Sequence, residues 1–130
     1  MAVFLARAFH LPETNNDYFT DDDGTFYEGS ANRLRAAGLT VGCGTTRYCG
    51  DRDIRRDEMA AMLTRALSLP TTSSDFFDDD AGSIFENAIN RIAASGVTKG
   101  CNPPANNHFC PERPVTRGEM AAFLKRSLQP

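Results

Sequence analysis

The most constraining feature of this sequence is an internal repeat. Residues 1–12 align with residues 59–70, and both segments contain the pattern Met-Ala-x-x-Leu-x-Arg-Ala-x-x-Leu-Pro. A third version of the pattern begins at Met120, and the register of the first two copies continues as far as Cys43 and Cys101. A repeat of roughly 60 residues is compatible with a helical repeat array, in which units complete their cores by packing on their neighbours.

The phase of the repeat divides the chain into three parts. Residues 1–12 correspond to the final helix of a preceding unit, residues 13–70 to one full unit and residues 71–130 to a second. Because the chain opens in the middle of a unit, we expect it to belong to a longer polypeptide, and a signal peptide would lie in the missing N-terminal part. The unmatched helix either completes a partial core or leaves a repeat face exposed, which self-association would cover.

Each unit is predicted to contain a short first helix. In the second copy Phe85, Ile89 and Ile92 recur at helical spacing, and the first copy repeats this pattern from Tyr27 to Leu34. The helices are expected to begin at capping boxes and to end at a glycine in the left-handed conformation. The expected capping pairs are Thr25 with Glu28 and Ser83 with Glu86, and the expected glycines are Gly38 and Gly96.

A second, longer helix is predicted from about residue 56 to 67, and again from about residue 117 to 128. Thr116 and Glu119 form a capping box at the start of the last helix, whereas the middle copy has Arg55 where the capping Thr belongs. The predicted fold class is therefore all-α, built from tandem helix-loop-helix units.

The loop between the two helices of each unit contains a pair of cysteines. The predicted disulfides are Cys43–Cys49 and Cys101–Cys110, one at the same place in each copy. Local pairing of an even number of cysteines favours disulfides and an oxidising, extracytoplasmic compartment. The alternative is a zinc site, but these spacings lack the tight C-x2-C knuckles that structural zinc prefers.

Composition excludes several classes of function. The chain has 130 residues and a net charge of −3, so it lacks the basic surplus that is typical of a nucleic-acid-binding protein. Its longest apolar stretches are too short to span a membrane. The two histidines, His10 and His108, are not equivalent between the copies, and no nucleophile–base constellation is evident. We therefore expect a protein that is not an enzyme and that requires no cofactor.

The order of motifs in the second copy resembles an S-layer homology (SLH) repeat. The matching motifs are Phe-Asp-Asp-Asp at 77–80, Gly-Val-Thr-Lys-Gly at 96–100, Phe-Cys-Pro at 109–111, and Val-Thr-Arg-Gly-Glu at 115–119. The same order recurs in the first full copy. The resemblance implies a helical module that holds an exported protein noncovalently to the cell envelope by binding a wall polysaccharide, often a pyruvylated one.

Three departures from the family pattern stand out. The aromatic-Ala pair of the family's first helix is Tyr27-Glu28 and Phe85-Glu86 here, and the middle copy reads Ile-Arg-Arg-Asp-Glu at residues 54–58. The paired cysteines are not general to the family and indicate a disulfide-containing branch. An alternative function is therefore an extracellular structural or protein-interaction module that binds no glycan.

The resemblance nominates Arg56 and Arg117, with the neighbouring Thr116, for contact with an acidic glycan. A guanidinium fork matches a carboxylate in a bidentate way, and the adjacent helix N-terminus also favours anions. The alternative is an ion pair within the protein. Tyr48 and Phe109 are candidates for stacking on sugar rings, with a place in the local core as the alternative.

Acidic residues cluster before each first helix. They suggest a Ca²⁺ site, because Ca²⁺ prefers carboxylate oxygens, although their spacing is not that of an EF-hand. The alternatives are stabilisation by the helix dipole, Asx-turns, or pairing with arginine. The candidate ligands are Asp21, Asp22 and Glu28 in the first copy and Asp79, Asp80 and Glu86 in the second.

Overall fold

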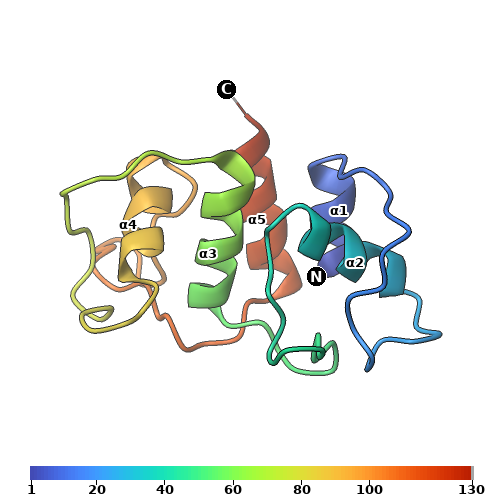
Figure 1. Cartoon of the computed structure of the whole chain (residues 1–130). Coiled ribbons are helices and arrows are strands. Elements are labelled where there is room, and N and C mark those ends of the chain that lie inside the picture. Colours follow the sequence, from blue (N-terminus) through green and yellow to red (C-terminus); the bar gives the residue numbers. More distant parts are fainter. Residues whose placement is uncertain (130) are drawn as a thin grey trace. The chain divides into compact units, whose positions relative to one another are not determined.

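The computed structural model describes residues 1–129, and this part of the chain is helical (Figure 1). The helices are α1 (Ala2–Ala8), α2 (Glu28–Ala36), α3 (Arg56–Leu67), α4 (Glu86–Ala94) and α5 (Arg117–Leu128). The described residues contain no strand beyond an isolated antiparallel bridge between Arg55 and Pro114. The all-α prediction is confirmed. Within the described residues, every helix is too short or too polar to span a bilayer.

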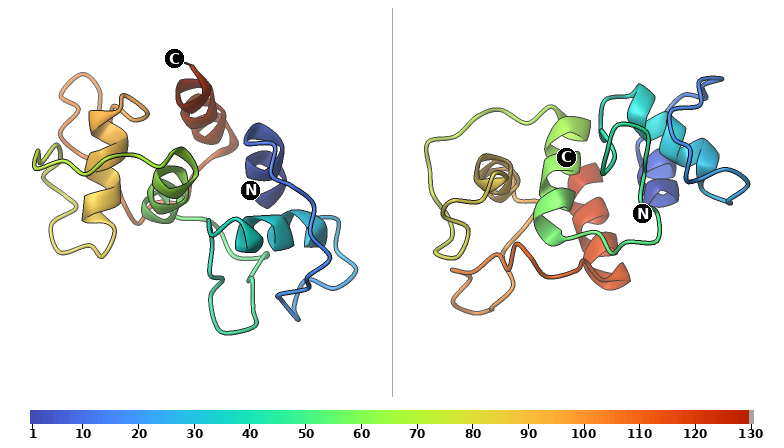
Figure 2. Two further views of the ribbon diagram at one scale, coloured as in Figure 1. Left: turned by 45° about the horizontal axis from the view of Figure 1, so that its top comes forward. Right: turned by 60° about the horizontal axis from the view of Figure 1, so that its bottom comes forward.

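The chain forms two compact units, each with its own helices. The first unit is Met1–Asp53, in which α1 packs on α2. The second begins at Ile54 and contains α3, α4 and α5; α4 packs on α3, and α3 and α5 lie side by side (Figures 1 and 2). These units are out of phase with the sequence repeat. The second helix of one repeat (α1 or α3) packs against the first helix of the next repeat (α2 or α4). Each compact unit therefore crosses a repeat boundary.

Helix α3 is the central element of the second unit. Eight of its twelve residues are buried, among them Met59 and Leu63. Ile89 and Ile92 of α4 and Phe123 of α5 are buried as well. Burying an aliphatic or aromatic side chain of this size stabilises a fold by about 1.5–3 kcal/mol. The apolar stripes read from the sequence are therefore the surfaces that hold the second unit together.

The predicted capping box is found at the start of α5 and is absent at the starts of α2 and α4. The predicted capping box of α5 is present: the Glu119 amide donates to Thr116 Oγ1 (3.0 Å), and the Thr116 amide donates to Glu119 Oε1 (3.1 Å). At α3, the amide of Arg55 donates to Glu58 Oε1 (3.0 Å). The arginine side chain has no acceptor, so only this half of a capping box forms.

The capping boxes predicted at Thr25 and Ser83 are wrong. Helices α2 and α4 begin at Glu28 and Glu86, two residues later than a cap at these positions requires. The Thr25 hydroxyl instead donates to the Asp22 carbonyl oxygen (2.7 Å), within a turn that precedes the helix. Competition from such local side-chain–backbone bonds is common for Ser and Thr, and here the turn takes the place of the first helical turn.

The helix ends agree with the sequence. Gly38 and Gly96 both have positive φ, at 78° and 81°. Beyond Gly38, the Leu39 amide donates to the Leu34 carbonyl oxygen (2.9 Å), and Val97 bonds Ile92 in the same way. This is the Schellman arrangement, in which a left-handed residue turns the chain back onto the last helical turn.

Both predicted disulfides are present, with Cα–Cα separations of 6.0 Å for Cys43–Cys49 and 6.1 Å for Cys101–Cys110. The amide of the first cysteine in each pair donates across its loop, from Cys43 to the Arg47 carbonyl oxygen and from Cys101 to that of His108. The longer second loop keeps this bond, so the extra residues extend the loop without changing its base.

A substitution at Gly100 would test how closely the Cys101–Cys110 loop packs against the backbone that precedes it. Gly100 has a φ of 98°, and an added Cβ atom would lie 2.7 Å from the His108 carbonyl oxygen. We expect Gly100→Ala to lower the free energy of unfolding by on the order of 2 kcal/mol, through both strain and overlap. Urea unfolding of the oxidised protein measures the effect. The control is Gly118→Ala within α5, which meets only Thr116 Oγ1 at 3.9 Å and should stabilise the protein slightly.

Candidate functional site

An open groove of about 660 Å³ lies in the second unit. Its lining comes from three segments: the start of α3, residues 79–84 before α4, and residues 110–113 after the disulfide. The charged residues of its lining are Arg55, Asp57, Asp79, Asp80, Glu112 and Arg113. This mixture of cations and carboxylates suits a polar ligand better than an apolar one.

The wall of the groove is fixed by backbone hydrogen bonds. The first amides of α3 are satisfied by the loop that follows the disulfide: Arg56 donates to the Arg113 carbonyl oxygen (2.9 Å), and Asp57 donates to that of Pro111 (3.0 Å). The Val115 amide donates back to Ile54 (2.8 Å). Amides at a helix N-terminus have no partner within the helix, so this loop supplies the partners.

Two half-exposed arginines line this groove. Arg55 forms a two-point ion pair with the buried Asp57 carboxylate, at 3.1 Å from Nε and 2.5 Å from Nη2, while 43% of its side chain remains exposed. Arg113 bonds Glu119 (2.6 Å) and is 48% exposed. Sequence reasoning missed both residues. Arg55 was treated only as a lost cap, and no pattern in the sequence places Arg113 beside it.

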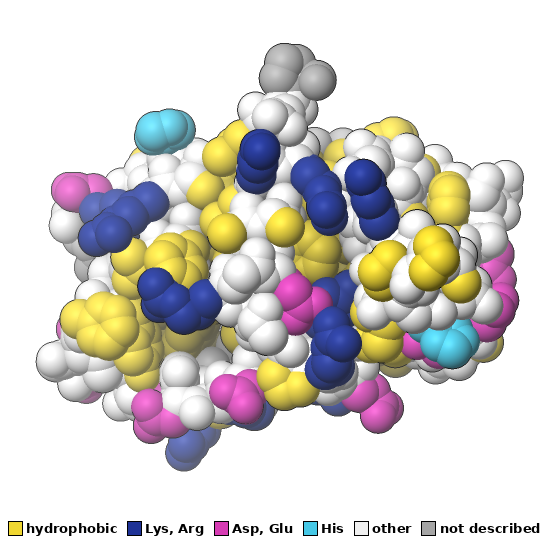
Figure 3. Space-filling model, turned by 180° about the vertical axis from the view of Figure 1, so that it is seen from behind, with side chains coloured by type: hydrophobic (Ala, Val, Ile, Leu, Met, Phe, Trp, Pro, Cys, Tyr) yellow, Lys and Arg dark blue, Asp and Glu magenta, His cyan; other side chains and the backbone are white. Residues whose placement is uncertain are grey.

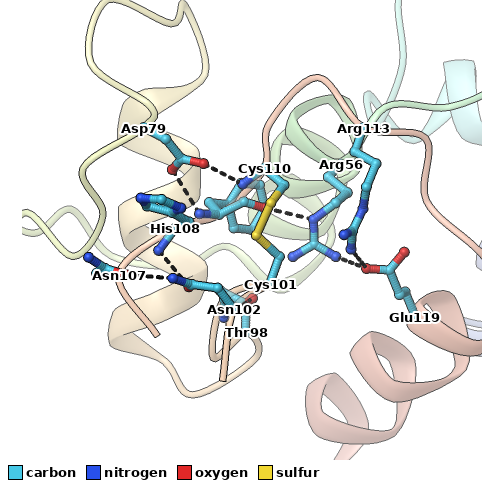
Figure 4. Close-up of a disulfide and its surroundings, with 12 residues drawn as sticks. Arg56, Asp79, Thr98, Cys101, Asn102, Asn107, His108, Cys110, Arg113 and Glu119 are labelled. Atoms are coloured by element: carbon cyan, nitrogen blue, oxygen red, sulfur yellow. Dashed lines mark hydrogen bonds and ion pairs between the residues drawn. A yellow bond between two sulfur atoms is a disulfide. The ribbon is translucent and has the colours of Figure 1, made fainter. Parts of the chain in front are cut away.

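The structure corrects the prediction for Arg56. Its side chain is only 2% exposed, and burial lowers the pKa of its guanidinium. Nε donates to the Phe109 carbonyl oxygen (2.8 Å), and Nη1 forms an ion pair with Glu119 (Figure 4). The guanidinium also lies over the rings of Phe109 and Phe123, 4.7 and 5.2 Å from their centroids. Arg56 is a structural residue of the interior, because its neighbours leave no surface for a ligand.

The two aromatic candidates also lie mainly within the protein. Phe109 is fully buried and packs on Phe77 with ring centroids 5.5 Å apart, so the prediction that it stacks on a sugar is wrong. Tyr48 is half-buried between Phe19 and Tyr27, with ring centroids at 5.3 and 5.9 Å. Burial raises the pKa of Tyr48 to about 12.

Thr116 and Arg117 are exposed at the start of α5 and are not part of the lining of the groove. The Thr116 hydroxyl oxygen caps the helix. On the face of the molecule drawn in Figure 3, Lys and Arg side chains are distributed among acidic and hydrophobic ones.

Asp21 and Asp79 hold the disulfide loops. Each carboxylate accepts two consecutive backbone amides: Asp21 from Tyr48 and Cys49 (2.7 and 2.8 Å), and Asp79 from the equivalent pair, Phe109 and Cys110 (both 2.8 Å; Figure 4). The amide bonds from Tyr48 and Cys49 hold the pKa of Asp21 below its usual value. Asp21 and Asp79, which were predicted to bind calcium, instead bond these amides, and neither belongs to the acidic clusters described below.

The aspartates that follow them have the opposite environment. Asp22 is 0% exposed and Asp80 is 1% exposed, and neither carboxylate oxygen of either residue has a hydrogen-bond partner among the described residues. Burial, with the nearby Asp75 and Glu86, raises the pKa of Asp80 to about 6; burial also raises the pKa of Asp22.

Each of these buried aspartates lies in an acidic cluster whose carboxylate oxygens are within 4.8 Å of one another. The first acidic cluster is Asp17, Asp22, Asp23 and Glu28, and the second is Asp75, Asp80 and Glu86. Asp17 and Asp75 were missed from the sequence. Each lies five residues before the buried aspartate of its copy, and this repeated spacing is the sequence signal that would have found them.

Comparison with known proteins identifies the repeat. Residues 76–121 match the S-layer homology domain model. This part of the chain belongs to the S-layer homology family. The match includes α4, the second disulfide loop and the start of α5, and therefore most of the segments that line the groove.

Three similar proteins extend the likeness beyond that segment. An amylopullulanase from Thermoanaerobacterium thermosulfurigenes is 29% identical over 94% of this chain, and the surface-layer 125 kDa protein of Lysinibacillus sphaericus is 25% identical over 98% of it. The middle cell wall protein of Brevibacillus brevis is 28% identical over 78% of the chain. The matches span only 6%, 11% and 10% of these relatives, so the chain corresponds to a small part of each.

Arg56 and Arg117 occupy equivalent positions in the SLH pattern, which allows a direct test of burial. We expect Arg56→Ala to lower the free energy of unfolding by about 3 kcal/mol, since the Glu119 carboxylate loses its buried partner. Arg117→Ala, at an exposed position, should change it by no more than about 0.5 kcal/mol. Urea unfolding of both variants checks this, and equal effects would contradict the structural role of Arg56.

The Asp79 carboxylate, which accepts two amides of the Cys101–Cys110 loop, gives a second test. Asp79→Ala should lower the free energy of unfolding by on the order of 2 kcal/mol, because it leaves the buried Phe109 amide and the Cys110 amide without their acceptor. Asp79→Asn keeps one acceptor oxygen and should lose less. The control is Asp53→Ala at an exposed aspartate. A result in which Asp79→Ala and the control are equally stable would contradict this role.

Proposed function

We propose that this chain is a cell-wall anchoring module that holds a larger exported protein noncovalently to an acidic envelope polysaccharide. The SLH match and the similarity to a surface-layer protein and a cell wall protein support the anchoring role. The observation that carries the choice of ligand is the pair of half-exposed arginines in the groove, Arg55 and Arg113.

The chemistry of these arginines suits an acidic sugar. A guanidinium has five N–H donors in a planar fork, and only two of those of Arg55 bond Asp57. Carboxylate groups orient both side chains within the protein, which reduces the entropy that a ligand must remove. A carboxylate on a polysaccharide would accept bonds from the remaining donors. Tyr48, Thr116 and Arg117 remain predicted contacts outside this groove.

The proposed location is the cell surface or the cell wall. Two disulfides are typical of an extracytoplasmic protein. Since the chain matches about a tenth or less of its relatives' lengths, the anchored partner would be the rest of a longer polypeptide. In this proposal the chain itself contributes attachment and no catalysis.

A second candidate function is a structural or protein-interaction module that binds no glycan. The burial of Arg56 and the internal ion pairs of Arg55 and Arg113 favour it, because arginines that are paired within the protein can serve stability alone.

Co-sedimentation with purified cell-wall sacculi tests the proposal. We expect the oxidised protein to bind intact sacculi and to lose binding after acid extraction of the secondary polysaccharide. Arg113→Gln and Arg55→Gln should each weaken binding about tenfold, as the loss of one charge-assisted bond predicts. Arg7→Gln, at an exposed arginine of the first unit, is the charge-matched control.

The outcomes separate the two functions. Binding that Arg113→Gln weakens, while its melting temperature stays close to that of the parent, supports recognition of polysaccharide by the groove. Arg55→Gln also removes the partner of the buried Asp57, so its binding is measured at a temperature at which the variant is folded. Binding that survives extraction, or folded protein that binds neither preparation, favours the protein-interaction module. Loss of binding by Arg117→Gln alone would move the contact from the groove to the start of α5.

A further inference from the structure

The proposed anchoring function assigns no role to the two acidic clusters, although Asp80 of the second cluster also lines the groove. In each cluster one aspartate, Asp22 or Asp80, is buried, and neither of its carboxylate oxygens has a hydrogen-bond partner in the described part of the chain. A buried carboxylate without hydrogen bonds or a counter-charge is strongly unfavourable. Here the neighbouring carboxylates add repulsion, since the oxygens lie within 4.8 Å.

The two copies reproduce this arrangement residue by residue. Asp17, Asp22 and Glu28 are separated by five and then six residues, and the second cluster has identical spacing. The first cluster lies in the first compact unit and the second cluster in the other. The same unfavourable geometry therefore forms twice, in separate cores, which argues that a ligand compensates it.

Within residues 1–129, no hydrogen bond supplies this compensation. The adjacent aspartates, Asp21 and Asp79, accept the loop amides, while the oxygens of the buried ones have no donor among the described residues. A multivalent cation neutralises several carboxylates at once and gives both oxygens of the buried aspartate a partner.

We propose that each acidic cluster binds one Ca²⁺ ion, with Asp22 and Asp80 as the central ligands. Two oxygens bound to the same Ca²⁺ at roughly 2.4 Å lie no more than about 4.8 Å apart, and the cluster oxygens meet this limit. Mg²⁺ keeps most of its waters and takes one or two carboxylates, so a set of three or four favours Ca²⁺.

The ion would link the loop before each first helix to the first turn of that helix. In the first cluster Asp17 belongs to the loop and Glu28 is the first residue of α2. The two sites differ in one respect: Asp23 of the first cluster is replaced by Ala81 in the second copy. The additional carboxylate should give the first site the higher affinity for Ca²⁺.

Calorimetric titration of the oxidised, metal-free chain with CaCl₂ tests the proposal. We expect two ions per chain, one after either Asp22→Asn or Asp80→Asn, and none in the double variant. Asp53→Asn changes the same charge at an exposed position and should keep both ions. Asp17→Asn and Asp75→Asn alter exposed ligands, so they should weaken each site without disturbing the interior.

Thermal unfolding separates a cation site from a merely unfavourable cluster. In EDTA, Asp22→Asn and Asp80→Asn should melt above the parent, because the substitution removes a buried charge and its amide donates to a neighbouring carboxylate. In CaCl₂ the parent should gain stability, and the double variant should gain none.

Terbium luminescence distinguishes the two sites. All three tyrosines lie in the first unit, and Tyr18 and Tyr27 flank the ligands Asp17 and Glu28, whereas phenylalanine occupies both positions in the second copy. Tyrosine-sensitised emission from bound Tb³⁺ should therefore disappear in Asp22→Asn and persist in Asp80→Asn. Failure of the folded parent to bind Ca²⁺, binding that survives in the double variant, or tighter binding of Mg²⁺ would overturn the proposal.

Discussion

The buried guanidinium of Arg56 joins the three segments on which the second unit depends. It extends from the first turn of α3 to the Phe109 carbonyl oxygen in the disulfide loop and to Glu119 in the first turn of α5, and it lies over two phenylalanine rings. Glu119 in turn bonds Arg113, which lines the groove. A change at this interior ion pair would therefore affect the fold and the geometry of the candidate ligand site together.

The paired aspartates show how one short sequence supports two kinds of interaction. Asp79 points toward the disulfide loop and accepts two of its amides, while Asp80, the next residue, is buried among carboxylates. The first copy divides these roles in the same way between Asp21 and Asp22. Neighbouring residues in a turn point in different directions, so a run of aspartates is not a single site. The proposed calcium sites follow from this division.

Much of the fold could be predicted from the sequence, because repetition, periodicity and capping act over short distances. The α5 capping box, the left-handed Gly38 and Gly96 and both disulfides follow from spacing within a few residues. The starts of α2 and α4 could not be predicted, because Thr25 can either cap a helix or bond a preceding turn. Local sequence allows both, and the choice depends on how the acidic turn packs.

The candidate site was the least predictable part. Arg56 and Arg117 hold equivalent positions in the repeat, yet one is buried and the other exposed. Arg55 resembles a defect in the pattern but lines the groove beside Arg113, 58 residues away in the chain. The sequence by itself determined the repeat, the helices, the disulfides and the family, since each is written in local spacing. Only the tertiary structure decided which charged groups are buried and which meet in the groove, because burial and proximity depend on segments that are distant in the chain.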